Sequence, residues 1–155
     1  MRRMLSAAVL ACVLVTGVAS AQSALPSPRQ QIEPLLDELM LAANAHDTDR
    51  FLAHYLRQPD LVFVYNGDVT LGWDNLRALQ LKWWNGGQSD VVYSQRGAPE
   101  FTVLTQKVVV VTDQLASSRT LPDGQLQTGE FVVTMVWEKR PEGWRIVQAH
   151  ESSVH

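Results

Sequence analysis

The chain has 155 residues, of which 46% are hydrophobic and 19% are charged, and its formal net charge is −3. A mildly acidic chain without a cluster of lysine and arginine argues against nucleic acids and anionic membranes as partners. Cys12 is the single cysteine, so neither a disulfide framework nor a cysteine metal site is expected.

The first 21 residues have the pattern of a secretory signal peptide. Arg2 and Arg3 precede an apolar run, and a small-residue cleavage site ends at Ala21. The run is shorter than the ~20 apolar residues that a membrane span needs. A lipoprotein site at Cys12 is the weaker alternative, because Leu10 is large for its position.

Export and cleavage would give a secreted or periplasmic protein that has no contact with the membrane once the signal is removed. Residues 22–28 are polar and proline-bearing, and we expect them to form a mobile lead. Residues 29–155 have the length of one ordinary domain with a single core.

Three helices are predicted. Ser27 is the N-cap of the first, and an apolar stripe follows it at helical spacing. Pro34 leaves two possibilities open, a kink or a start near residue 33. The second helix has Asp47 or Thr48 as its cap, and the third occupies residues 73–84 after Gly72.

Strands make up most of the rest of the chain. They are marked by β-branched and aromatic residues between turn signals such as Asn66-Gly67. Helices followed by a run of antiparallel strands indicate the α+β class, with helices covering one face of a curved sheet. The predicted strands are residues 61–65, 68–71, 91–96, 100–104, 108–119, 130–138 and 144–151.

The last strand carries the most informative pattern. Because side chains alternate between the two faces of a strand, Trp144, Ile146, Gln148 and His150 are predicted to share one face. A titratable imidazole in line with an apolar Trp and Ile indicates a pocket.

The register of the last hairpin stays open. A four-residue loop pairs Lys139 with Trp144 and sets Val133 opposite His150, whereas a three-residue loop sets Thr134 there. This one-residue difference exchanges the two faces of the strand.

The segments 134–139, 143–147 and 150–152 resemble the C-terminal signature of the SnoaL-like and DUF4440 group in the NTF2-like superfamily. The resemblance implies a cone-shaped α+β barrel in which N-terminal helices cover a curved antiparallel sheet. It also implies a deep cavity between sheet and helices, and a homodimer. The same scaffold hosts isomerases, dehydratases, epoxide hydrolases, polyketide cyclases, and binding or assembly domains.

His150 is the first candidate for catalysis, because an imidazole exchanges protons near neutral pH. Tyr65 can donate its phenol to a carbonyl, or it is a core residue. Arg119 can bind a carboxylate, or it pairs with Glu130. A second acid near His150 is needed for catalysis, and the candidates are Asp68, Asp113 and Glu130.

Aromatic residues are the candidates for ligand contacts: Tyr55, Trp73, Trp83 and Trp144. No phosphate loop, acyl-serine motif or metal-ligand spacing is found, so no cofactor and no metal are expected. The predicted function is binding of a small, largely apolar molecule. The alternatives are a cofactor-independent lyase, isomerase or cyclase that uses His150, and a dimerising structural module.

Overall fold

The computed structural model describes residues 25–153. Its helices are α1 (Pro28–Asn44), α2 (Thr48–Leu52), α3 (Trp73–Trp83) and a short 3-10 helix, η1 (Asn85–Gly87). The strands are β1 (Val62–Tyr65), β2 (Asp68–Leu71), β3 (Val92–Gln95), β4 (Glu100–Thr105), β5 (Val108–Thr120), β6 (Leu126–Arg140) and β7 (Gly143–Ser153). The predicted signal peptide lies outside the described residues.

The helices begin where the sequence predicts. The Ser27 side chain caps the backbone N–H of Gln30, and the Gln30 side chain accepts from Ser27 in return. Asp47 caps α2. α1 runs from Pro28 through Pro34, so the predicted alternative of a helix start near residue 33 is wrong. Within residues 25–153 no helix is both long and apolar enough to cross a membrane.

All strands belong to one curved sheet with the order β2-β1-β7-β6-β5-β3, and β4 also pairs with β5. The prediction of an antiparallel sheet is wrong in one place. β1 and β7 run parallel, with Phe63 beside Ala149. Turn signals report only on strands that are neighbours in the chain, and these two strands are far apart in it. The result is a mixed, unclosed sheet.

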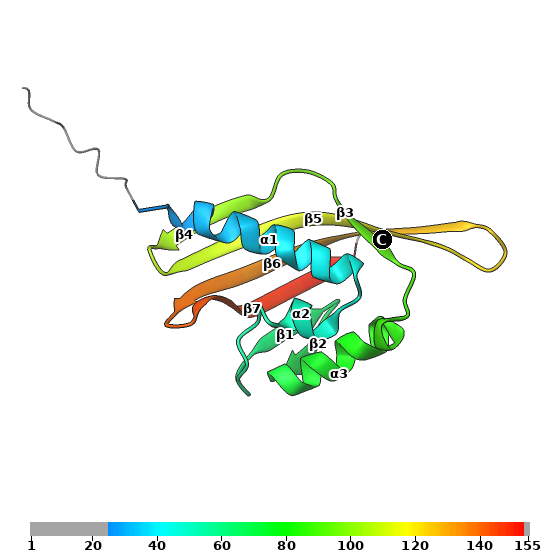
Figure 1. The fold of residues 1–155 in the computed structure, drawn as a ribbon, viewed down its shortest axis with the longest axis horizontal. Coiled ribbons are helices and arrows are strands. Elements are labelled where there is room, and N and C mark those ends of the chain that lie inside the picture. The colour runs from blue at the N-terminus through cyan, green and yellow to red at the C-terminus, as the bar shows by residue number, and fades with distance from the viewer. Residues whose placement is uncertain (1–24, 154–155) are drawn as a thin grey trace, which may run out of the picture.

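The helices lie over one face of this sheet, and the α+β class is therefore confirmed (Figure 1). α1 packs on β3 and β4, and α3 packs beside β2. Apolar side chains from both layers form the core, with Ile32, Leu52, Trp137 and Ile146 fully buried. The β5–β6 hairpin extends beyond this body as a two-stranded ribbon (Figure 1).

A bulge in β7 decides which side chains reach the core. Trp137 pairs with Ile146, but Val136 pairs with Gln148, so Val147 has no partner of its own on β6. Trp144 and Ile146 are buried as predicted. Beyond the bulge the alternation is shifted by one residue.

The same bulge resolves the register of the hairpin. Lys139 pairs with Trp144, as expected for the longer loop, yet His150 pairs with Thr134, as expected for the shorter one. The extra residue, Val147, accounts for both pairings.

Candidate functional site

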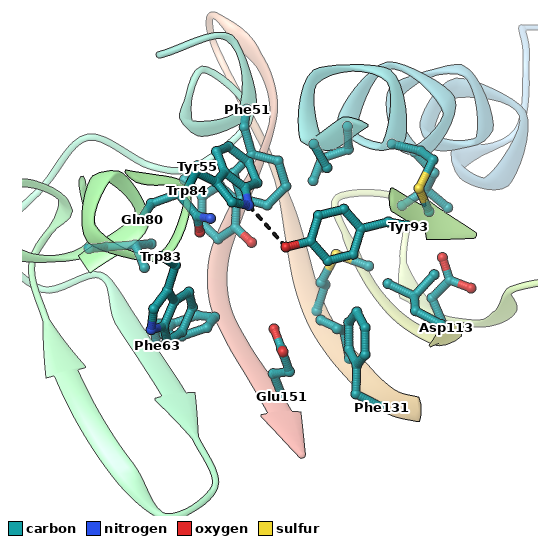
Figure 2. A pocket seen from close by; sticks show the side chains of 18 residues that line it. Phe51, Tyr55, Phe63, Gln80, Trp83, Trp84, Tyr93, Asp113, Phe131 and Glu151 are labelled. Carbon is teal, nitrogen blue, oxygen red and sulfur yellow. Dashed lines mark hydrogen bonds between the residues drawn. The ribbon is translucent and has the colours of Figure 1, made fainter. Parts of the chain in front are cut away.

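A cavity of about 110 Å³, called here the inner chamber, lies between the sheet and the three α-helices. Its wall is mainly apolar, with Leu39, Ala43, Leu115 and Met135 among the lining residues. Seven aromatic side chains complete it: Phe51, Tyr55, Phe63, Trp83, Trp84, Tyr93 and Phe131 (Figure 2).

The aromatic wall is held by specific contacts. The Trp84 indole N–H donates to the Tyr93 hydroxyl at 3.0 Å, which joins the end of α3 to β3 (Figure 2). Phe51 packs edge-on against Trp84, with ring centroids 5.1 Å apart. The chamber is therefore preformed by packing between helices and sheet.

Glu151 enters the chamber from β7, between Trp83 and Phe131 (Figure 2). Burial raises the pKa of its carboxyl to about 7, because an ionised group loses solvation in an apolar site. A carboxyl with such a pKa can both release and accept a proton at neutral pH.

Asp113 is the second carboxyl of the chamber and comes from β5. Its side chain is 4% exposed. Gln95 donates to Oδ2 at 3.2 Å, whereas Oδ1 has no hydrogen-bond partner within the described part of the chain. Burial raises the pKa of Asp113, and hydrogen bonding from the Gln95 side chain and the Gln114 backbone opposes this shift without cancelling it. An unpartnered buried oxygen is costly, so Oδ1 is suited to a bound group.

A wider pocket of about 500 Å³, called here the outer pocket, adjoins the chamber and is more polar. Four residues line both spaces: Trp83, Tyr93, Phe131 and Glu151. Glu151 thus stands at the boundary between an apolar interior and a polar entrance.

Tyr65 and Arg119 both line the outer pocket. The Arg119 Nε donates to Gln127 at 2.7 Å and not to Glu130, which pairs with Arg96 at 2.9 Å. Of the two interpretations of Arg119, the pairing with Glu130 is therefore wrong. Glu130 lines the outer pocket from an exposed position.

His150 does not line either space. It is exposed on the outer face of the sheet, between Val64 and Thr134 in the register. The prediction that it shares a face with Ile146 is wrong, because the bulge at Val147 turns it outward and turns Glu151 inward. His150 is thus not placed to contact a molecule in the chamber.

The four aromatic candidates divide into two pairs. Tyr55 and Trp83 line the inner chamber. Trp73 lies in a separate surface groove, where Arg57 stacks on its ring at 4.5 Å. Trp144 is a core residue whose indole N–H donates to Gln31 at 3.2 Å.

Sequence reasoning missed the position of Glu151 and left Asp113 as one of three candidates. The strand pattern around Asp113 carried a usable signal, since Val109, Val111 and Asp113 alternate on the buried face. For Glu151 the alternation pointed to the wrong face, and only the bulge corrects it.

No group of three or more histidine, cysteine, aspartate or glutamate side chains in residues 25–153 is arranged to hold a metal ion. The arrangement offers two separate acids, hydroxyl and indole donors, and an apolar wall. Groups of these kinds can bind a small molecule and exchange a proton with it.

Comparison with known proteins places this site in a family context. Residues 32–155 match the model of the SnoaL-like domain. No curated protein matches the chain. Among solved structures, an NTF-2 like protein of unknown function from Shewanella oneidensis MR-1 is 26% identical, with a TM-score of 0.66 over 81% of this chain and 98% of that one.

Two more distant structures share the fold. A ketosteroid isomerase-like protein from Erwinia carotovora atroseptica is 19% identical, with a TM-score of 0.64 over 81% of this chain and 95% of that one. The association domain of CaMKII from C. elegans is 17% identical, with a TM-score of 0.65 over 80% and 94%. With its family model matched from Ile32 to the last residue, the chain belongs to the SnoaL-like domain family of the NTF2-like superfamily.

Proposed function

We propose that this domain binds a small molecule whose apolar part fills the inner chamber and whose polar part faces Glu151 and the outer pocket. One observation carries the proposal: a preformed apolar chamber contains a 4% exposed carboxyl, Asp113, with an unpartnered oxygen. Concave, mainly apolar sites with a few convergent polar groups are typical ligand sites. The volume of about 110 Å³ suits only a compact group.

Filling the chamber tests this proposal. Leu115 lines the chamber, so Leu115→Phe is expected to reduce the binding of small aromatic and alicyclic fragments at least tenfold. Ligand-detected NMR on the purified protein measures this loss. Gln114→Phe is the matched control, because Gln114 is the neighbouring residue on β5 and is exposed on the other face.

Equal binding of the fragments by both variants would show that the chamber is not the binding site. Circular dichroism of each variant establishes that the fold is retained before affinities are compared.

Acid/base catalysis is the second candidate function, with Glu151 in the role first assigned to His150. The raised pKa of Glu151, about 7, favours it, because a general base works best when its pKa is near the working pH. Tyr65 lines the adjoining outer pocket, and its hydroxyl is a potential donor to a developing oxyanion. A general base and a hydrogen-bond donor are the kinds of group that isomerase, lyase or cyclase reactions use.

Catalysis predicts a specific response to mutation. Glu151→Gln should lower kcat/KM by roughly 10²–10⁴-fold, since it removes the proton-transfer group. In the parent protein kcat/KM should rise with pH and level off above about 7. His150→Gln, one residue away on the exposed face, should keep full activity. Loss of activity in His150→Gln alone would contradict this assignment.

Export and dimerisation remain proposals. The sequence pattern of residues 1–21 supports export, and N-terminal sequencing of exported protein tests it. The outer sheet face, where half-exposed Val110, Val132 and Val136 lie, supports a homodimer. Sedimentation equilibrium tests the dimer. Membership of the DUF4440 group is likewise proposed from the resemblance in the last two strands.

A further inference from the structure

The charged groups of the inner chamber are all of one sign. Asp113 and Glu151 line it, and no lysine, arginine or histidine among residues 25–153 does. Carboxyls buried without a cation are costly when ionised, and a bound cation removes that cost. The chamber residues therefore supply no positive charge to balance Asp113 and Glu151 when these are ionised.

Asp113 lies on β5 and Glu151 on β7, the two strands that flank β6, and both residues line the chamber. Asp113 pairs with Val133, and Val133 pairs with Glu151, so the three residues form one row across β5, β6 and β7. Neighbouring strands are ~4.8 Å apart, which puts the Cα atoms of the two acids about 10 Å apart. A compact group above Val133 would lie between the two carboxyls.

Aromatic side chains form a large part of the remaining wall, beside aliphatic side chains and Gln80. Seven of them line the chamber, and the faces of such rings attract cations, most strongly when water is excluded. Aromatic cages bind quaternary ammonium groups through the ring faces, and a nearby carboxylate adds an opposite charge.

We propose that the inner chamber binds a compact alkylammonium group between Asp113 and Glu151. This assignment rests on the proposed binding function. The volume of about 110 Å³ fits this assignment, since a cavity of roughly 150 Å³ in another protein holds benzene. A hydroxyl or another polar substituent on the same molecule would extend past Glu151 into the outer pocket.

Two ligands of the same shape test the role of charge. Choline carries a trimethylammonium head, and 3,3-dimethylbutan-1-ol is its neutral carbon analogue. Calorimetric titration of the full chain should show choline binding at least tenfold more tightly. The chamber would still be a binding site, but not for cations, if the alcohol bound as tightly as choline.

The pH dependence gives an independent test. The charged and titratable groups around Glu151 are Tyr55, Tyr65, Tyr93, Asp113, Arg119 and Glu130. Because the pKa of Glu151 is about 7, choline affinity should rise roughly tenfold from pH 6 to pH 8, as the carboxylate becomes populated. A fall in choline affinity over this range would mean that the ionised Glu151 carboxylate does not hold the ammonium group, and would overturn the proposal.

Variants assign the effect to the two carboxyls. Glu151→Gln and Asp113→Asn should each weaken choline binding about tenfold or more, and Glu151→Gln should abolish the pH dependence. Glu100→Gln is the control, since Glu100 is exposed on β4 and lines neither the chamber nor the outer pocket. If choline does not bind, the cation assignment is wrong. The binding function itself is tested separately, by the effect of Leu115→Phe on the affinity for neutral fragments.

Discussion

Glu151→Gln is expected to be more stable than the parent protein by up to about 3 kcal/mol at pH 8, and equally stable at pH 4. The reason is the burial of the carboxyl, which raises its pKa from 4.5 to about 7 in the folded protein. A shift of this size corresponds to about 3 kcal/mol of preference for the protonated form.

The sign follows from proton binding. Between pH 4.5 and about 7 the folded protein holds a proton on Glu151 that the unfolded chain has released. The free energy of unfolding therefore falls as the pH rises through this range, and the full cost is present above about pH 7. Glutamine is neutral throughout, so the variant does not bear this cost.

Urea denaturation of both proteins at several pH values measures the difference. Glu130→Gln serves as the control, because Glu130 is exposed and its substitution should show no such pH-dependent gain. A constant difference between Glu151→Gln and the parent from pH 4 to pH 8 would mean that Glu151 is solvated in the folded state. Functional sites commonly lower the stability of a protein, and the burial of an ionisable acid is one way in which this happens.

The elements of the fold were predictable because their signals are local. Ser27 and Asp47 mark helix starts through their own side chains, and Asn66-Gly67 permits a tight hairpin through positive φ at both residues. The parallel pairing of β1 with β7 was not predictable, because no short segment of sequence encodes the direction of a distant strand.

The site was predicted only in part. Tyr55 and Trp83, two of the aromatic candidates for ligand contacts, line the chamber, and their contact with a ligand stays a prediction. Strict alternation through Val147 predicts that His150 faces the chamber, whereas the bulge places Glu151 there. A bulge depends on how the neighbouring segments pack, and here residues 54–56 bond to the backbone of Ile146 just before it. That contact cannot be read from the alternation of β7 itself.

Trp144→Ala is expected to lower the free energy of unfolding by roughly 3–5 kcal/mol, the usual cost of removing a large core side chain. Trp144 is 5% exposed and lies before the bulge, on the buried face that it shares with Ile146. Its indole N–H also donates to Gln31, which ties β7 to α1. The substitution therefore removes both apolar contacts and a link between the two layers.

Trp83→Ala is the matched comparison, because Trp83 is 36% exposed and borders the chamber instead of filling the core. Its loss should cost less than half as much stability, while weakening the binding of any molecule in the chamber. Equilibrium denaturation and fragment binding, measured on both variants, separate these effects. A loss below about 1 kcal/mol for Trp144→Ala, the range of surface substitutions, would mean that Trp144 does not lie on the buried face of β7.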